Sequence, residues 1–192
     1  MSEIVAREFD DAAMALRAFN ADASNAERVE QLADACAASI RSGGKVLAIG
    51  NGGSCADAMH FCEELTGRYR EDRPSLPAIA CIDPGHLTCT ANDYGFEQVF
   101  SRWVEGLGRE GDVLVAMSTS GNSANIVRAV EAARSGGLSV ALLLGKDGGR
   151  LRGLGDFEWI APGETSDRIQ EIHMLVLHAL VGAIERHAPW DR

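Results

Sequence analysis

The sequence predicts an α/β fold, a three-layer αβα domain around a parallel sheet with two helices in front of it. Short apolar runs of four to six residues recur from residue 46 onward, and longer segments with helical spacing lie between them. This alternation is typical of a parallel sheet that helices cover on both faces. Before residue 43 the apolar residues follow helical spacing alone. We therefore expect a single domain over 1–192, with a helical extension at 1–42 and the αβα core and long last helix at 43–187.

The first two elements are predicted helices. Residues 3–20 carry apolar side chains at helical spacing with charges between them. A second helical stretch runs from about Asn25 to Arg41 and stops at Ser42-Gly43-Gly44, which is a helix-ending signal.

Five apolar runs then predict the strands, and the last of them is the most alternating. They are Val46–Ile49, Ala78–Ile82, Val113–Met117, Val140–Leu144 and Phe157–Ile160. The most polar internal segment, residues 68–74, is interpreted as a solvated loop. The final segment, Ser166 to His187, is apolar almost all the way round a helix and must be buried on most faces. It packs either against another subunit or as a central helix within one subunit.

Charge and cysteine usage exclude several classes of protein. A formal net charge of -10 argues against a protein that wraps nucleic acid. Five scattered cysteines without a Cys-x-x-Cys pair indicate reduced thiols rather than a disulfide framework. The N-terminus lacks the pattern of a signal peptide, and the longest apolar stretch, Leu138 to Leu144, is too short to span a bilayer. We expect a cytoplasmic protein with no nucleic-acid or membrane partner.

Two strand–loop–helix turns have the composition of phosphate sites. Residues 50–54 read Gly-Asn-Gly-Gly-Ser after the first predicted strand, and residues 118–123 read Ser-Thr-Ser-Gly-Asn-Ser after the third. Free backbone N–H groups and the positive end of a helix dipole converge at such a turn. Glycine lets the backbone approach a ligand, and hydroxyls donate further hydrogen bonds. Each turn can also be a tight turn with a helix N-cap and no ligand.

Other nucleotide-binding motifs are incomplete. Cys55 stands where the dinucleotide fingerprint that begins at Gly50 needs a glycine. No Gly-x4-Gly-Lys-Ser/Thr sequence is present, so a nucleotide P-loop is not supported.

Titratable residues on two predicted helices are candidates for chemistry. His60 and Glu64 are four residues apart and project from one helix face, where they can share a divalent metal. The same spacing suits an exposed ion pair or a hydrogen-bonded core histidine. Gln170 and His178 are separated by about 12 Å of helical rise, so their spacing alone does not indicate a shared site. His173 is interpreted as structural.

The two loops resemble the phosphosugar loops of the sugar-isomerase (SIS) domain. Within that superfamily, three segments are similar to the sedoheptulose-7-phosphate isomerases, also called phosphoheptose isomerases. They are the stretch from Asp57 to Tyr69, Ala91 to Phe96, and Asp167 to His173. The resemblance runs from the N-terminal helices to about Glu185. It implies a flavodoxin-like, five-stranded parallel sheet between helices and a homotetramer with active sites at subunit interfaces.

The resemblance also implies an activity, the aldose–ketose isomerisation of D-sedoheptulose 7-phosphate to D-glycero-D-manno-heptose 7-phosphate. The reaction would pass through an enediolate and open the biosynthesis of nucleotide-activated heptose. Such chemistry needs a base for a carbon-bound proton, a proton relay and stabilisation of the oxyanion. The non-enzyme alternative is a tetrameric SIS-domain adaptor of a replication-initiation protein or a sugar-phosphate sensor, which need not keep the acid–base residues together.

Site residues follow from the resemblance, position by position. Glu64 is expected to be the base and His178 the acid/base. One zinc ion per site is expected on His60, Glu64, Gln170 and His178. The substrate would contact Asn51, Gly52, Gly53, Ser54, His60, Glu64, Asn92, Asp93, Ser118, Thr119, Ser120, Ser123 and Gln170. Asn92 and Asp93 would lie near the sugar chain, since a carboxylate suits hydroxyls and repels phosphate; they also suit a turn before Tyr94-Gly95. One departure is Cys55, where some relatives have histidine.

Overall fold

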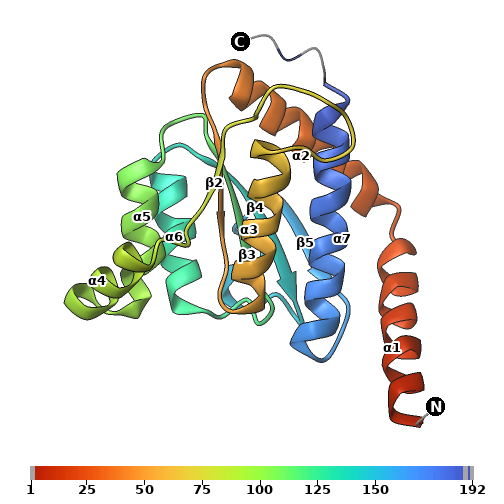
Figure 1. Cartoon of the computed structure of the whole chain (residues 1–192). Helices are drawn as coiled ribbons and strands as arrows, with labels where there is room; N and C mark the ends of the chain where they lie inside the picture. Colours follow the sequence, from red (N-terminus) through yellow and green to blue (C-terminus); the bar gives the residue numbers. More distant parts are fainter. Residues whose placement is uncertain (1–2, 188–189, 191–192) are drawn as a thin grey trace.

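A five-stranded parallel sheet forms the centre of the molecule (Figure 1). The structure is a computed structural model that describes residues 3–187 and 190. The strand order is β2-β1-β3-β4-β5, and all four neighbouring pairs are parallel. The strands are β1 (Val46–Ile49), β2 (Ala78–Ala80), β3 (Val113–Ser118), β4 (Ser139–Gly145) and β5 (Phe157–Ala161). The predicted fold class is confirmed.

Most strand limits agree with the sequence, and β2 is the exception. It ends at Ala80, two residues before the predicted end at Ile82. The N–H of Cys81 still donates to the carbonyl of Ala48, but the chain then turns away to begin a helix. Asp83 caps that helix by accepting a hydrogen bond from the N–H of His86, and Pro84 occupies its first turn. The capping signal therefore ends the strand early.

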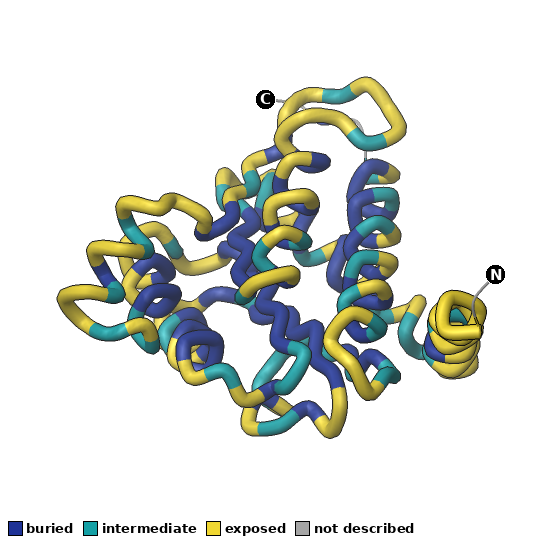
Figure 2. Tube along the Cα trace, turned by 60° about the horizontal axis from the view of Figure 1, so that its bottom comes forward, coloured by how far each residue is buried: buried dark blue, intermediate teal, exposed yellow. Residues whose placement is uncertain are grey.

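Helices cover both faces of the sheet because successive strand residues point in opposite directions. On one face, Val46 and Ala48 of β1 pack with side chains from α2 (Ser24–Arg41), α3 (Gly53–Thr66) and α7 (Ser166–Glu185). On the other, Leu47 and Ile49 pack with α5 (Val99–Leu107) and α6 (Ala124–Ser135). Figure 2 shows the buried strands between these two layers.

Three further elements accompany the second layer. α4 (Pro84–Tyr94) and the 3-10 helix η1 (Phe96–Gln98) precede α5, and a second 3-10 turn, η2 (Gly149–Leu151), follows β4. α4 lies at the outer margin of this layer, as Figure 1 shows. No helix among the described residues combines the length and the apolar content that crossing a membrane requires.

The helix α1 (Glu3–Asn20) lies to one side of the core and runs beside α7 (Figure 1). Ala15 is its only described buried residue, and Figure 2 shows the helix as mostly exposed. α7 itself is buried over most of its length within this one chain, from Ile169 to Glu185. The central-helix alternative therefore accounts for most of its apolar surface, while Leu175 stays 42% exposed.

Residues 68–74 form a loop, as predicted, but the loop is not solvated throughout. The side chain of Arg73 is 4% exposed, and its Nε lies 3.1 Å from Oε1 of Glu185 near the end of α7. This buried ion pair holds the loop against the core. The polarity of the segment gave no indication of it, because the partner lies 112 residues away.

Candidate functional site

Both predicted phosphate loops lie at the same edge of the sheet. β1 and β3 are neighbouring parallel strands, so the loops that follow them leave the sheet side by side. Residues 50–52 lead from β1 into α3, and residues 119–123 lead from β3 into α6. The amino ends of both helices are therefore at this edge, where open α/β sheets bind ligands and where helix dipoles favour anions.

The loop at residues 50–54, the glycine loop, is closely packed. A side chain at Gly50 would meet the backbone carbonyl of Ser54, and a Cβ on Gly53 would lie 2.6 Å from Oε1 of Gln170. The side chain of Asn51 is hydrogen-bonded to that of Asn125 in the first turn of α6, the helix that follows the other loop. Ser54 is 3% exposed and accepts a hydrogen bond of 3.3 Å from Nε2 of Gln170.

The hydroxyls of the second loop contact one another and the start of α7. Ser118, the last residue of β3, donates from Oγ to Oγ of Ser123 at 3.3 Å. Oγ1 of Thr119 lies 3.2 Å from Oγ of Ser166. Oγ of Ser120 accepts a hydrogen bond from the N–H of Asn122. The loop therefore presents several hydroxyls close to the N-terminus of α6.

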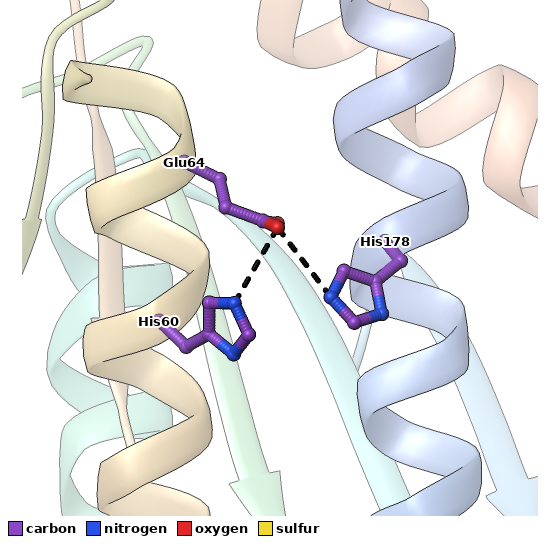
Figure 3. A group of neighbouring side chains, drawn as sticks. All are labelled: His60, Glu64 and His178. Carbon is purple, nitrogen blue, oxygen red and sulfur yellow. Dashed lines mark ion pairs between the residues drawn. The ribbon is translucent and has the colours of Figure 1, made fainter. Parts of the chain in front are cut away.

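Apart from the two loops, three titratable side chains form a cluster: His60, Glu64 and His178 (Figure 3). Oε1 of Glu64 lies 3.4 Å from Nε2 of His60 and 3.4 Å from Nε2 of His178. The imidazole rings of the two histidines meet edge to face, with centroids 5.2 Å apart. α3 supplies His60 and Glu64 from one face, and α7 packs beside α3 to bring His178 opposite them.

Burial shapes the chemistry of Glu64. The residue is 6% exposed, and this burial raises the pKa of its carboxyl above the ordinary value, while the nearby His178 and His60 act in the opposite direction. Its second oxygen, Oε2, is buried without a hydrogen-bond partner among the described residues. One carboxylate and two imidazoles, with ligand atoms within 4.8 Å of one another, suit a divalent metal such as zinc. The group therefore fits a metal site.

The remaining predicted residues lie in different places. Gln170 is two helical turns before His178 on α7, and its amide contacts Ser54 at the glycine loop. Asn92 and Asp93 lie in the last helical turn of α4, not in a loop before Tyr94-Gly95, and both are exposed. Nδ2 of Asn92 donates to Oδ1 of Asp93 at 2.7 Å. His173 is buried and its Nε2 lies 2.9 Å from the carbonyl oxygen of Leu144, in agreement with its structural interpretation.

Two features of the site were not expected from sequence. The ring of Tyr69 stacks on His178 with centroids 5.9 Å apart and planes 12° apart. Asp57, one turn before His60 on α3, has a carboxyl oxygen that is buried without a partner among the described residues, and burial raises its pKa to about 6. Both residues fall within the stretch that carried the family resemblance, which was the available signal.

Comparison with known proteins places this geometry in a family. Residues 9–145 match the SIS domain. A phosphoheptose isomerase of Edwardsiella ictaluri is 54% identical over 96% of both chains. The solved structure of phosphoheptose isomerase GmhA from Neisseria gonorrhoeae superimposes with a TM-score of 0.88 at 41% identity, covering 95% of this chain and 98% of that one. A phosphoheptose isomerase from Francisella tularensis gives a TM-score of 0.90 at 36% identity, covering 97% and 100%. The chain therefore belongs to the SIS domain family and, within it, to the phosphoheptose isomerases.

Proposed function

We propose that the chain is an intramolecular oxidoreductase that converts D-sedoheptulose 7-phosphate to D-glycero-D-manno-heptose 7-phosphate. The observation that carries this proposal is the contact of one buried carboxylate with two imidazoles, two of the three residues lying on α3, the helix that begins at the first predicted phosphate loop. Relatives that match almost the whole chain are named phosphoheptose isomerases, which supports the same reaction. The product would enter the synthesis of nucleotide-activated heptose.

The proposed reaction is two proton transfers at neighbouring carbons. The Glu64 carboxylate takes the proton from C1 of the open-chain ketose, and the electron pair of that C–H bond forms the C1–C2 double bond of an enediolate. Return of a proton to C2 gives the aldose, so no oxidant or reductant is consumed. A buried carboxylate of raised pKa is suited to hold that proton. His178 would move protons to and from the substrate oxygens and assist ring opening.

Zinc is the proposed cofactor, with His60, Glu64, Gln170 and His178 as its ligands. Bound zinc would supply Lewis-acid stabilisation of negative charge on the substrate oxygens. Three of these residues already form the cluster described above, and the unpartnered Oε2 of Glu64 is a free ligand atom. If Glu64 both ligates and abstracts, it changes between the two roles during turnover.

Substrate binding is assigned to the two loops and α4. The phosphate would contact the N–H groups and side chains of Asn51 to Ser54 together with Ser118, Thr119, Ser120 and Ser123. His60, Glu64 and Gln170 would face the reacting end, and Asn92 and Asp93 the sugar hydroxyls. Asp93 would lie at the opposite end of the substrate from the serines, where its carboxylate would not repel the phosphate.

We also propose that four copies assemble as a homotetramer in the cytoplasm. A groove of about 750 Å³ lies between α1, α2 and α7, and both Leu16 and His178 line it. A groove that includes a proposed catalytic residue suits an active site completed by a neighbouring copy. All five cysteines are free, which agrees with a reducing compartment.

The activity is tested by incubating the purified protein with sedoheptulose 7-phosphate and following the aldose product by NMR. We expect turnover that stops when a chelator removes the metal and returns when zinc is added. Absence of product from wild-type protein supplied with zinc would reject the isomerase and favour the adaptor or sensor alternative.

A further inference from the structure

A buried asparagine joins the two phosphate loops. Asn125 is the second residue of α6, is 3% exposed, and was not among the predicted ligands. Its side chain exchanges two hydrogen bonds with that of Asn51, 74 residues earlier in the chain. Nδ2 of Asn51 donates to Oδ1 of Asn125 at 3.0 Å, and Nδ2 of Asn125 donates to Oδ1 of Asn51 at 2.9 Å. The glycine loop is thereby connected to the first turn of α6.

The orientation of this amide pair is set by the backbone of α6. The N–H of Ile126 donates to Oδ1 of Asn125 at 3.0 Å. Because an N–H needs an oxygen acceptor, this contact fixes which end of the Asn125 amide is the oxygen. That oxygen must in turn face the nitrogen of Asn51. The start of α6 therefore determines which way the Asn51 amide is turned.

Asn51 keeps hydrogen-bonding capacity for a ligand. An amide nitrogen carries two hydrogens, and the bridge uses one of those on Nδ2 of Asn51. Asn51 is half-buried, whereas Asn125 is fully buried behind it. A ligand can therefore reach Asn51, whereas Asn125 can act on a ligand only through Asn51.

We propose that Asn125 is a positioning residue for phosphate binding. By holding Asn51 and fastening the glycine loop to the amino end of α6, it makes the two loops a single preorganised anion pocket. The proposal rests on the proposed function in so far as that function assigns the substrate phosphate to these loops. Asn125 makes no contact with the ligand, and its whole effect on binding depends on its two hydrogen bonds with Asn51.

A double-mutant cycle separates this role from a general structural one. The variants are Asn51→Ala, Asn125→Ala and the pair together. We measure the Kd of inorganic phosphate by calorimetry, and the KM and kcat for sedoheptulose 7-phosphate. Asn125→Ala is expected to raise Kd and KM about tenfold, equivalent to about 1.4 kcal/mol, with kcat changed less than about twofold. In the Asn51→Ala background the same change should add less than about twofold, because the group that it positions is already absent.

A near-isosteric variant and a matched control sharpen the result. Asn125→Asp keeps the oxygen that accepts from Ile126 but sets a second oxygen against Oδ1 of Asn51, so it should weaken phosphate binding at least as much as Asn125→Ala. Ser101→Ala removes an equally buried polar group on α5, hydrogen-bonded to Gln98, and should leave Kd, KM and kcat unchanged. Circular dichroism establishes that each variant is folded.

The outcomes distinguish this proposal from the proposed function. Losses that add fully in the double variant, or an unchanged Kd in both Asn125 variants, overturn the positioning role even when wild type turns over the substrate. Wild-type protein that binds phosphate without turnover fails the proposed function, while the phosphate cycle still decides the role of Asn125. Wild type that neither binds phosphate nor isomerises the sugar contradicts both.

Discussion

His173 is the most deeply buried of the described histidines, at 1% exposure. Its Nε2 lies 2.9 Å from the carbonyl of Leu144, where α7 meets the end of β4. Nδ1 is buried without a hydrogen-bond partner among the described residues. Burial lowers the pKa of this imidazole to about 4, while its hydrogen bond to Leu144 acts in the opposite direction. A neutral imidazole is thus part of the packing between the helix and the sheet.

We expect His173 to make stability depend on pH. In the unfolded chain the imidazole titrates near its ordinary pKa of about 6.5, so below that pH the unfolded state binds a proton that the folded state binds only near pH 4. His173 therefore does not reduce the free energy of unfolding above about pH 6.5. As the pH falls towards 4, that free energy decreases by on the order of 3 kcal/mol. His173→Gln cannot titrate. Urea unfolding of both proteins at pH 7 and pH 4 should therefore show a smaller loss in the variant, and parallel losses would refute the assignment.

At the scale of elements, one buried ion pair fastens the loop between α3 and β2. Besides Glu185, the guanidinium of Arg73 donates to the carbonyls of Glu64 and Leu65 at the end of α3, at 2.6 and 2.7 Å. The carboxylate of Glu185 accepts from the backbone N–H groups at residues 70 and 71. The same loop carries Tyr69, which stacks on His178. The Arg73–Glu185 ion pair therefore helps to hold Tyr69 against His178 of the candidate site.

Breaking that pair should cost both stability and activity. Glu185→Ala leaves the Arg73 charge buried without its partner, and we expect a loss of about 3–5 kcal/mol in the free energy of unfolding. Tyr69 should also lose its stacking on His178, so kcat should fall. Glu30→Ala breaks the exposed pair with Arg186 and should cost less than about 1 kcal/mol. Equal stability losses in the two variants, measured by urea unfolding, would contradict this account of the loop.

The sequence predicted elements better than it predicted contacts. Four of the five strands lie within one residue of the expected limits at either end, because their apolar runs have no competing signal. The capping residue Asp83 shortened the other. The two loops lie side by side because β1 pairs with β3, and that strand order was not predicted from the sequence. Likewise, the Asn51–Asn125 bridge joins residues 74 apart, and nothing in the pattern of either loop indicates it.

The cluster of His60, Glu64 and His178 was predictable only in part. The four-residue spacing of His60 and Glu64 was compatible with a metal, an ion pair or a core histidine. The approach of His178 depends on α7 packing against α3, a tertiary contact that only the family resemblance indicated. The predicted role of Gln170 stays a prediction, since its amide contacts Ser54.

At the scale of the whole molecule, α1 leaves apolar side chains exposed along its length. Ile4, Phe9 and Met14 are 73%, 68% and 59% exposed, and Leu16, which lines the groove, is 46% exposed. Covering such side chains would contribute roughly 25 cal/mol for each Å² removed from water. This surface is consistent with the proposed tetramer, in which a neighbouring copy would cover it.

Light scattering in solution tests that assembly. We expect wild type at four times the mass of the chain, and a shift to smaller species in Leu16→Asp, because the new charge would be buried without a partner. Asp10→Asn on the exposed surface of the same helix should leave the mass unchanged. A monomeric wild type would exclude the tetramer, and a tetrameric Leu16→Asp would place the interface elsewhere.

The central claim, that the Glu64 carboxylate moves the substrate proton, is tested most directly by turnover of Glu64→Gln in parallel with wild type. Glutamine preserves the size of the side chain but cannot accept the proton. With zinc supplied to both proteins, we predict a fall in kcat of at least about 10²-fold for sedoheptulose 7-phosphate, while the Kd of inorganic phosphate stays within about twofold of wild type. A variant that binds phosphate normally and isomerises the sugar at the wild-type rate would contradict the account.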